Sequence, residues 1–258
     1  MSFVLTEFLN TLLFYLISDK MIELKNSAFF RNALEAISAF IPEGNFRFSE
    51  DGVYFKAIDP SQVVLVDYFI DKKLFDKYDV EPNFVGIDIV EMNKILQRAM
   101  PQDKLSIDLS DSELRIKLES ELKRSFRLPL IDVSEEEVKI PDIKYSTKII
   151  VGSNSLKEVL RDAALFGSSV VLKIKNGAFV IEARGSQGTM ESEAKNVSEV
   201  ESNGDVTAKF SLNFLQNIVK EADPAKKINI GLKSDSPMKV SFEMGQSKIT
   251  FFLAHMIL

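Results

Sequence analysis

Residues 51–67 read DGVYFKAIDPSQVVLVD, which is two extended runs separated by one turn. Asp51-Gly52 is typical of a tight hairpin turn, and the runs at 53–58 and 63–66 are rich in the β-branched and aromatic residues that strands prefer. Asp59-Pro60-Ser61 lies between them and predicts the second turn. Because the strands follow one another in hairpins and no glycine-rich phosphate fingerprint accompanies them, a dinucleotide-binding α/β fold is excluded.

The residues around this stretch predict two helices and further strands. Apolar residues between Phe29 and Ile41 recur at the three-and-four spacing of an amphipathic helix, and a second helix is expected over Ile89 to Met100. Phe46-Arg47-Phe48 alternates as a strand does. Leu105 to Leu118 predicts a further hairpin, turned at 110–112.

The second half of the chain repeats this order. Leu160 lies 126 positions after Leu34, and Ile218 lies 123 positions after Ile95, a spacing that indicates an internal duplication. The elements expected there are helices over 155–166 and 212–222 and strands over 148–151, 170–175, 178–183, 227–232 and 238–244. The fold class is therefore α+β, with two tandem copies of one unit made of two helices on antiparallel sheets.

The duplication also predicts the domain boundaries. Residues 21–128 form the first domain, 129–143 a connector, and 144–258 the second domain, because the prolines and acidic block of 129–141 are typical of a linker. Residues 1–20 are an apolar N-terminal extension or come from a misassigned start at Met1; the alternative is an amphipathic membrane anchor. The stretch lacks a secretory signal's basic region and is too interrupted for a confident membrane span.

Composition excludes several classes of site. The chain has no cysteine and one histidine, His255, so disulfides, thiol nucleophiles and Cys/His zinc sites are ruled out. A net charge of -6 argues against a protein that coats nucleic acid with its whole surface, so any DNA-facing surface must be local. The absence of cysteine fits a reducing compartment. We expect no cofactor and no metal.

Four motifs resemble one family, the sliding clamps of archaea and eukaryotes known as the proliferating cell nuclear antigen (PCNA) family, and the archaeal type in particular. Residues 51–67 are similar to that family's DG...A.DPS.V.LV pattern, and GIDIVEMNKIL at 86–96 to its second-helix motif. LPLID at 128–132 is similar to the start of its interdomain connector, and LAHMI at 253–257 to its terminal segment. The likeness runs from about Met21 to the C-terminus.

This resemblance implies a DNA-clamp fold, with antiparallel sheets outside and helices inside, and three subunits joined edge strand to edge strand. The pairing strands would lie around Lys123 to Leu128 and Thr189 to Lys195. The expected interface residues are Lys123, Arg124, Ser125, Phe126, Arg127, Thr189, Met190, Glu191, Ser192 and Glu193. Ordinary edge strands of a monomer are the alternative, although ring closure would satisfy unpaired backbone groups.

If helices line the central hole, their polar faces meet the phosphates of double-stranded DNA without reading its sequence. The DNA-binding candidates are Arg31, Lys94, Arg98, Lys157, Arg161 and Lys220. Arg31, Lys94, Arg161 and Lys220 fall on positions that are basic in the family. Arg98 and Lys157 are added because the helical repeat places them on the same polar faces. Glu35, Glu91, Glu158, Asp162 and Glu221 share these helices, so a solvated face of internal ion pairs is the alternative.

The resemblance also implies a groove beneath the connector that takes a short peptide from partner enzymes. The groove residues carried over are Ile58, Gln62, Leu65, Val138, Ile140, Pro141, Pro237, Phe252 and Ala254. Plain packing under a loop is the alternative. His255 stands where the family has proline and Met256 where a basic residue is common, and both departures bear on how this groove binds.

The function implied is a DNA polymerase sliding clamp, a processivity factor in DNA replication and repair that catalyses nothing. Its partners would be duplex DNA, DNA polymerase, the clamp loader and other peptide-bearing enzymes, with a homotrimer as the assembly. The alternatives are a subunit of a heterotrimeric replication or checkpoint clamp, an enzyme using carboxylates such as Asp108 and Glu113, and a membrane-associated protein. The expected location is the cytoplasm, on the nucleoid, if the source is archaeal, and the nucleus if it is eukaryotic.

Overall fold

The computed structural model describes residues 21–110, 112–134, 138–194 and 198–257. The N-terminal stretch 1–20 and the acidic block 135–137 therefore lie outside the described residues. The first half of the chain runs β1 (Met21–Leu24), α2 (Ala28–Ser38), β2 (Glu43–Phe48), β3 (Gly52–Ile58), β4 (Val64–Asp71), η1 (Lys72–Leu74), β5 (Lys77–Asp79), β6 (Asn83–Asp88), α3 (Ile89–Leu96), β7 (Lys104–Leu109), β8 (Glu113–Glu119) and β9 (Lys123–Pro129).

The second half repeats that order, apart from the short η1 turn, and confirms the predicted duplication. It runs β10 (Thr147–Gly152), α4 (Ser153–Ala163), β11 (Ser169–Lys175), β12 (Ala178–Gly185), β13 (Gly188–Glu193), β14 (Ser198–Ser202), β15 (Val206–Ser211), α5 (Leu212–Lys220), β16 (Lys227–Leu232), β17 (Met238–Met244) and β18 (Ser247–Leu253). The fold is α+β, as the order of hairpins and amphipathic helices in the sequence predicted.

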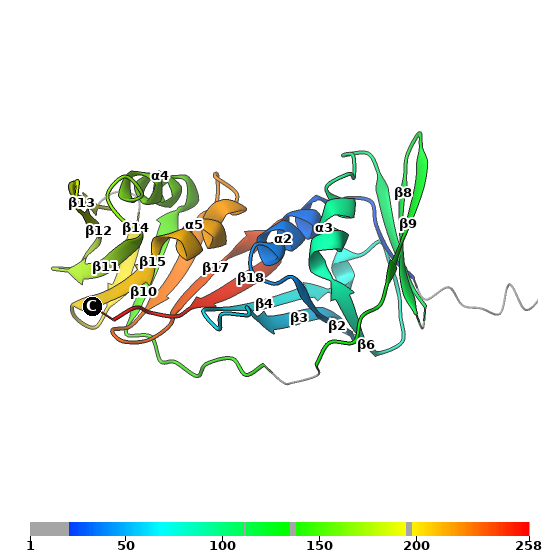
Figure 1. Cartoon of the computed structure of the whole chain (residues 1–258), viewed down its shortest axis with the longest axis horizontal. Coiled ribbons are helices and arrows are strands. Elements are labelled where there is room, and N and C mark those ends of the chain that lie inside the picture. The colour runs from blue at the N-terminus through cyan, green and yellow to red at the C-terminus, as the bar shows by residue number, and fades with distance from the viewer. Residues whose placement is uncertain (1–20, 111, 135–137, 195–197, 258) are drawn as a thin grey trace, which may run out of the picture.

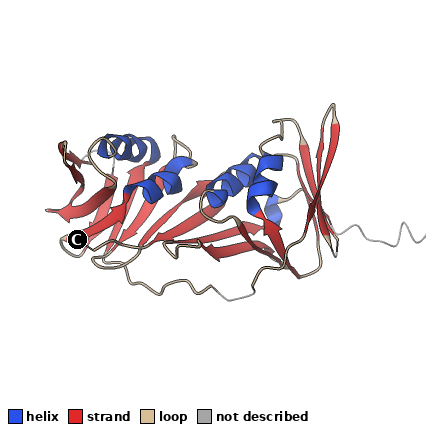
Figure 2. Ribbon diagram, in the orientation of Figure 1, coloured by secondary structure: helices blue, strands red, loops and turns tan. Residues whose placement is uncertain are grey.

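The helices all lie on one face of an elongated molecule, and the strands form the other layer (Figures 1 and 2). The strands of the described residues form three antiparallel sheets, which make up this second layer. The central one has nine strands in the order β14-β10-β16-β17-β18-β4-β3-β2-β6, and the outer ones are β5-β1-β7-β8-β9 and β13-β12-β11-β15. The helices are distributed along the long axis of the molecule, on the same side of these sheets (Figure 1).

The central sheet joins the two halves of the chain. β18, the last strand of the second half, pairs antiparallel with β4 of the first half, and Phe251 lies opposite Val66 in this register. Both side chains are fully buried. The two halves are therefore held together by a backbone ladder as well as by side-chain packing.

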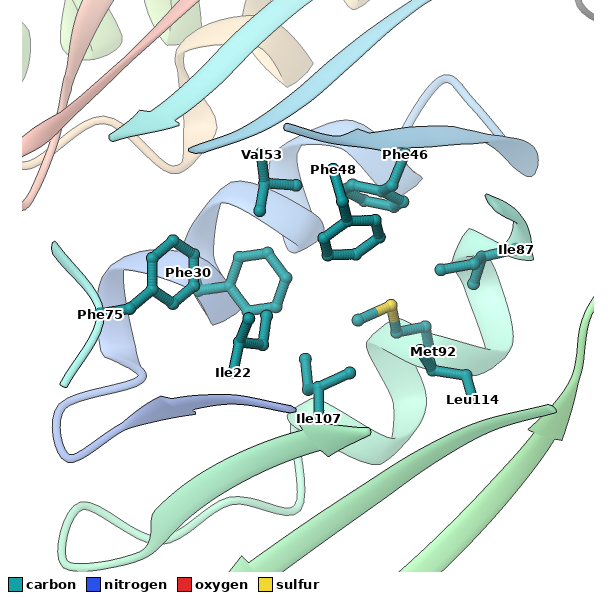
Figure 3. Close-up of a pocket in the computed structure, with 10 residues that line it drawn as sticks. All are labelled: Ile22, Phe30, Phe46, Phe48, Val53, Phe75, Ile87, Met92, Ile107 and Leu114. Carbon is teal, nitrogen blue, oxygen red and sulfur yellow. The ribbon is translucent and has the colours of Figure 1, made fainter. Parts of the chain in front are cut away.

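The core lies between the helices and the sheets. In the first half, apolar side chains from α2, α3 and the surrounding strands point toward one another around a cavity of about 10 Å³, too small for more than a single water (Figure 3). Phe30, Phe46 and Met92 are each less than 4% exposed. The apolar faces that the sequence periodicity predicted are the ones buried here.

Helix ends differ from the sequence expectations by a few residues. α3 ends at Leu96 instead of Met100, because the N–H groups of Arg98 and Ala99 bond three residues back, to Ile95 and Leu96, instead of four, and Pro101 follows. α4 spans 153–163 instead of 155–166, and α5 ends at Lys220 instead of Ala222. None of the described helices is long and apolar enough to cross a membrane.

Candidate functional site: a helix layer, two open strand edges and a connector groove

The six basic candidates lie on or just beyond the helices, and most of them are exposed. The side chains of Lys94, Arg161 and Lys220 are 63%, 67% and 61% exposed. Arg31 is half-buried and donates to the carbonyl of Ala99 at 3.3 Å, which ties α2 to the end of α3. The helix layer therefore does present positive charge on the face away from the sheets.

Most of these cations already have partners on the same layer. Lys94 Nζ lies 2.6 Å from Glu91, and Arg161 is paired with Glu158 one helical turn earlier. Lys220 Nζ lies 3.5 Å from Glu35 of α2, which is a contact between the two halves of the chain. Hydrogen bonding to Glu91 raises the pKa of Lys94.

Lys157 is placed differently from the others. Its ammonium donates to the carbonyls of Lys220 at 2.8 Å and Ala222 at 2.5 Å, so it caps the C-terminal end of α5. The side chain is half-buried, and this burial lowers its pKa. Helical phase alone could not reveal this role, because the cap comes from a different helix. Arg98, the other candidate from helical phase, is exposed.

The two predicted interface strands are sheet edges at opposite ends of the molecule (Figure 1). Among the described strands, β9 pairs only with β8, and β13 pairs only with β12. β9 spans Lys123 to Pro129, one residue past the expected Leu128, and β13 begins at Gly188. The expected end at Lys195 lies outside the described residues.

The exposed faces of these edges carry opposite charge. Lys123, Ser125 and Arg127 are exposed along β9, whereas Thr189, Glu191 and Glu193 are exposed along β13. The alternate residues Phe126 and Met190 are half-buried and pack against the core of the chain. Each edge therefore has an apolar inner side and a charged outer side, one basic and one acidic.

A buried ion pair anchors the start of β9, and sequence reasoning missed it. Asp103 is 1% exposed and accepts hydrogen bonds from Ser120 Oγ at 2.6 Å and from the Met100 N–H at 2.7 Å. Arg124 pairs with Asp103 and also donates to the carbonyl of Arg98 at 2.9 Å. Burial favours the protonated acid, but these hydrogen bonds and the Arg124 charge outweigh it and lower the pKa of Asp103.

The connector groove candidates lie on four segments: β3 and β4 with the turn between them, the connector, the turn before β17, and the end of β18. Ile58 and Ile140 are 44% and 41% exposed, whereas Leu65 and Phe252 are buried and lie opposite each other in the β4–β18 ladder. Gln62 has a φ of 58° at the tip of the turn. Among the remaining candidates, Val138, Pro141, Pro237 and Ala254 are half-buried.

Asp59 shapes the turn at one side of this groove. Its carboxylate accepts from the N–H groups of Val63 and Val64 at 2.7 and 2.5 Å, and from the hydroxyl of Ser61. Burial alone would raise the pKa of Asp59, but these hydrogen bonds lower it. The DPS motif is therefore explained by turn chemistry, since its aspartate satisfies backbone donors that no strand partner reaches.

Tyr145, at the far end of the connector, is a residue with a structural role that sequence reasoning overlooked. Its ring packs against the Cα of Gly231, where an added Cβ would come within 2.9 Å of it, and its hydroxyl donates to the carbonyl of Pro237 at 3.2 Å. It also lines a cavity of about 390 Å³ on the outer face of the central sheet. The only sequence signal was an aromatic residue between the polar Lys144 and Ser146.

Comparison with known proteins assigns the family. Models of the proliferating cell nuclear antigen N-terminal and C-terminal domains match residues 21–138 and 139–257. Proteins named DNA polymerase sliding clamp are similar over most of the chain. The one from Thermococcus gammatolerans is 32% identical over 87% of this chain and 93% of its own length. The one from Methanococcus vannielii is 30% identical over 89% and 96%.

The fold agrees with that assignment. A crystal structure of PCNA from Thermococcus kodakaraensis superposes with a TM-score of 0.86 over 92% of this chain and 99% of that one, at 23% identity. At that identity the match supports the shared fold, while the family models and the sequence relatives carry the relationship. This chain is therefore a member of the proliferating cell nuclear antigen family.

Proposed function

We propose that the chain is a DNA polymerase sliding clamp, three copies of which close into a ring around duplex DNA and tether replication and repair enzymes to it without catalysing a reaction. The relatives' names support the clamp activity. One structural observation supports the homotrimer. The joint between β18 and β4 inside the chain is the arrangement that the open edges β9 and β13 would make between chains.

The duplication relates these strands residue by residue. β9 is the counterpart of β18, because Phe126 lies opposite Ile116 in the first half as Phe251 lies opposite Val240 in the second. β13 is the counterpart of β4, because Met190 lies opposite Ala183 as Val66 lies opposite Ala57. Since Phe251 lies opposite Val66 within the chain, Phe126 of one copy would lie opposite Met190 of the next.

This register is chemically consistent along its whole length. It places the apolar Phe126 and Met190 together on the inner side, and it sets Lys123 opposite Glu193 on the outer side. Arg127 lies opposite Thr189 and diagonal to Glu191, within reach of its long side chain. Because β9 and β13 complement each other on one chain, a second copy suffices as the partner, which favours the homotrimer over a heterotrimeric replication or checkpoint clamp.

The helix layer would then line the hole. Arg31, Lys94, Arg98, Arg161 and Lys220 face away from the sheets or lie at helix ends and would contact phosphates, while Lys157 contributes through the cap it provides. Contacts confined to phosphates differ little from one position to the next along the duplex. The ring could therefore slide.

The connector groove would hold a short apolar peptide from DNA polymerase, the clamp loader or other clients. Ile58 and Ile140 are exposed, and Leu65 and Phe252 are buried partners in the β4–β18 ladder, so these segments offer apolar side chains for peptide anchors. No cofactor or metal enters this function. We propose a cytoplasmic, nucleoid-associated location, since the relatives named above are archaeal.

A disulfide across the proposed joint tests both the register and the homotrimer. In this register Ser125 lies opposite Glu191 of the next copy, where Cα atoms of antiparallel partners are about 4.5 to 5.5 Å apart, a distance that a disulfide spans. The chain has no cysteine of its own. We expect the S125C/E191C variant, oxidised while it is on circular duplex DNA, to give a covalent trimer that stays on that DNA after a high-salt wash and leaves it when the DNA is linearised.

The control is S125C/E193C, which shifts one cysteine by two residues and should cross-link much less, because diagonal neighbours are too far apart. Equal cross-linking in both variants would show that the register is wrong. If both proteins remain 29.1 kDa monomers in solution without any cross-link, the homotrimer is wrong and a ring with other chains is favoured.

A further inference from the structure

The carboxylates of the helix layer pair with the same cations that would contact DNA. Glu91 and Glu158 are each one helical turn before their partners, Lys94 and Arg161, and all four side chains are half or more exposed. Phosphate approaching these cations therefore meets a charge that is already neutralised. It must displace a carboxylate before it gains a contact of full strength.

Glu35 is the most firmly held of these carboxylates. One of its oxygens accepts from Asn93 Nδ2 at 2.7 Å and from Gln97 Nε2 at 3.1 Å, both on or just after α3. The other lies 3.5 Å from Lys220 of α5. Its side chain is 31% exposed, and its amide partners hold it in place between the halves of the chain whether or not Lys220 leaves it.

We propose that Glu35, Glu91 and Glu158 act as built-in competitors of DNA phosphate, which keep the grip of the helix layer on duplex DNA weaker than its cations alone would give. This inference rests on the proposed clamp function. The carboxylates determine how strongly the ring holds DNA, and thus how freely it moves. Lys220 exchanges between Glu35 and phosphate, and the i,i+3 pairs exchange in the same way on α3 and α4.

Because these ion pairs are exposed, replacing the carboxylate by a phosphate costs little free energy. An exposed ion pair is weak and screened by salt, so phosphate can replace the carboxylate, but the replacement yields only the difference between two similar contacts. Charge-neutral glutamine keeps the size of each side chain. At position 35 it also keeps an oxygen that can accept from Asn93 and Gln97. The substitutions E35Q, E91Q and E158Q thus remove these three competitors while preserving the packing, and they leave Glu221, whose carboxylate also lies 3.5 Å from Lys220, in place.

The test compares four proteins by fluorescence anisotropy on a short labelled linear duplex, over a series of salt concentrations. We expect E35Q/E91Q/E158Q to bind about tenfold more tightly than the natural protein at low salt, with a steeper salt dependence, since each added phosphate contact adds about one unit to the slope. The control E50Q/E199Q/E201Q removes the same charge from exposed sites, one of them the ion pair between Glu199 and Lys227, and should change affinity less than twofold.

The fourth protein, R31A/K94A/R161A/K220A, separates this inference from the proposed function. If that variant loses binding while E35Q/E91Q/E158Q behaves like its control, the carboxylates do not compete and the inference is overturned, although the helix layer still contacts DNA. If the alanine variant binds as tightly as the natural protein, the helix layer is not the DNA-binding surface. Should E35Q impair folding in thermal unfolding, E91Q/E158Q alone must still bind more tightly than E199Q/E201Q.

Discussion

The last strands of the two halves have the same position in the repeat and different surroundings. β18 is covered on both sides, by β17 and by β4, whereas β9 has β8 on one side and no described strand on the other. Phe251 of β18 is fully buried, and its counterpart Phe126 of β9 is half-buried. The comparison teaches that the joint between β18 and β4, which holds the two halves of the chain together, is also the arrangement that the proposed trimer would repeat between chains.

Removing the aromatic ring from each strand tests the difference between β18 and β9 most directly. F251A should lower the free energy of unfolding by about 3 to 5 kcal/mol, because it leaves a cavity in a closed core. F126A should cost the chain only about 1 kcal/mol but weaken the proposed trimer strongly, since in that trimer its partner Met190 belongs to the next copy. Urea unfolding and light scattering at one protein concentration measure the two effects. An equal loss of stability in both variants would contradict the difference.

The next effect concerns the ion pair that anchors the open edge. D103N removes a buried charge beneath Arg124 and should cost about 3 kcal/mol in urea unfolding at neutral pH, because the guanidinium loses its buried counter-charge. Since the pKa of Asp103 is lowered in the folded chain, its contribution is complete above the unfolded value of 3.8 and is lost as pH falls through the lower folded value. The stability difference from the natural protein should therefore shrink in acid. A pH-independent difference would show that the charge is not responsible.

Reversing the charges of one edge should have a smaller effect on assembly. E191K/E193K places like charges opposite Lys123 and beside Arg127, and we expect trimer dissociation to become about ten- to a hundredfold easier, or about 1.4 to 2.7 kcal/mol. The second reversal, K123E/R127E in the same chain, should restore the trimer. Sedimentation measures the assembly. Failure of the second change to restore it would show that these residues do not face one another.

The smallest effect concerns the connector, which crosses the outer side of the internal joint (Figure 1). Y145F loses the hydrogen bond to Pro237 and should cost about 1 kcal/mol. Burial raises the pKa of Tyr145 to about 12, so the neutral phenol contributes its stability below the unfolded value of 10, and that stability is lost as pH rises from 10 through 12. The natural protein should thus approach Y145F in stability in strong alkali. Trimer assembly should stay unchanged in both.

The sequence predicted most of the fold because its signals are local. Hairpin turns such as Asp51-Gly52 and apolar periodicity along helices depend on neighbours a few residues away, and the near-constant offset between the halves made the duplication visible. Helix ends shifted by a few residues, because caps are made by backbone groups that periodicity does not report.

The site was predicted less completely. The basic helix positions, the edge strands and the groove residues came from motifs and family resemblance. Three contacts were not predicted in this way: the cap that Lys157 provides, the ion pair of Asp103 with Arg124, and the packing of Tyr145 against Gly231. Each of these joins residues that lie 21 to more than 60 positions apart, such as Lys157 and Ala222, so no local pattern could indicate it.

The sequence by itself determined that this is a duplicated α+β chain of the clamp family. Only the tertiary structure decided that β18 joins β4 and leaves β9 and β13 open at opposite ends, and that Glu35 reaches Lys220 across the two halves. The physical reason is that strand pairing and ion pairing act through space. Composition and spacing fix which groups are available, whereas the fold fixes which of them meet.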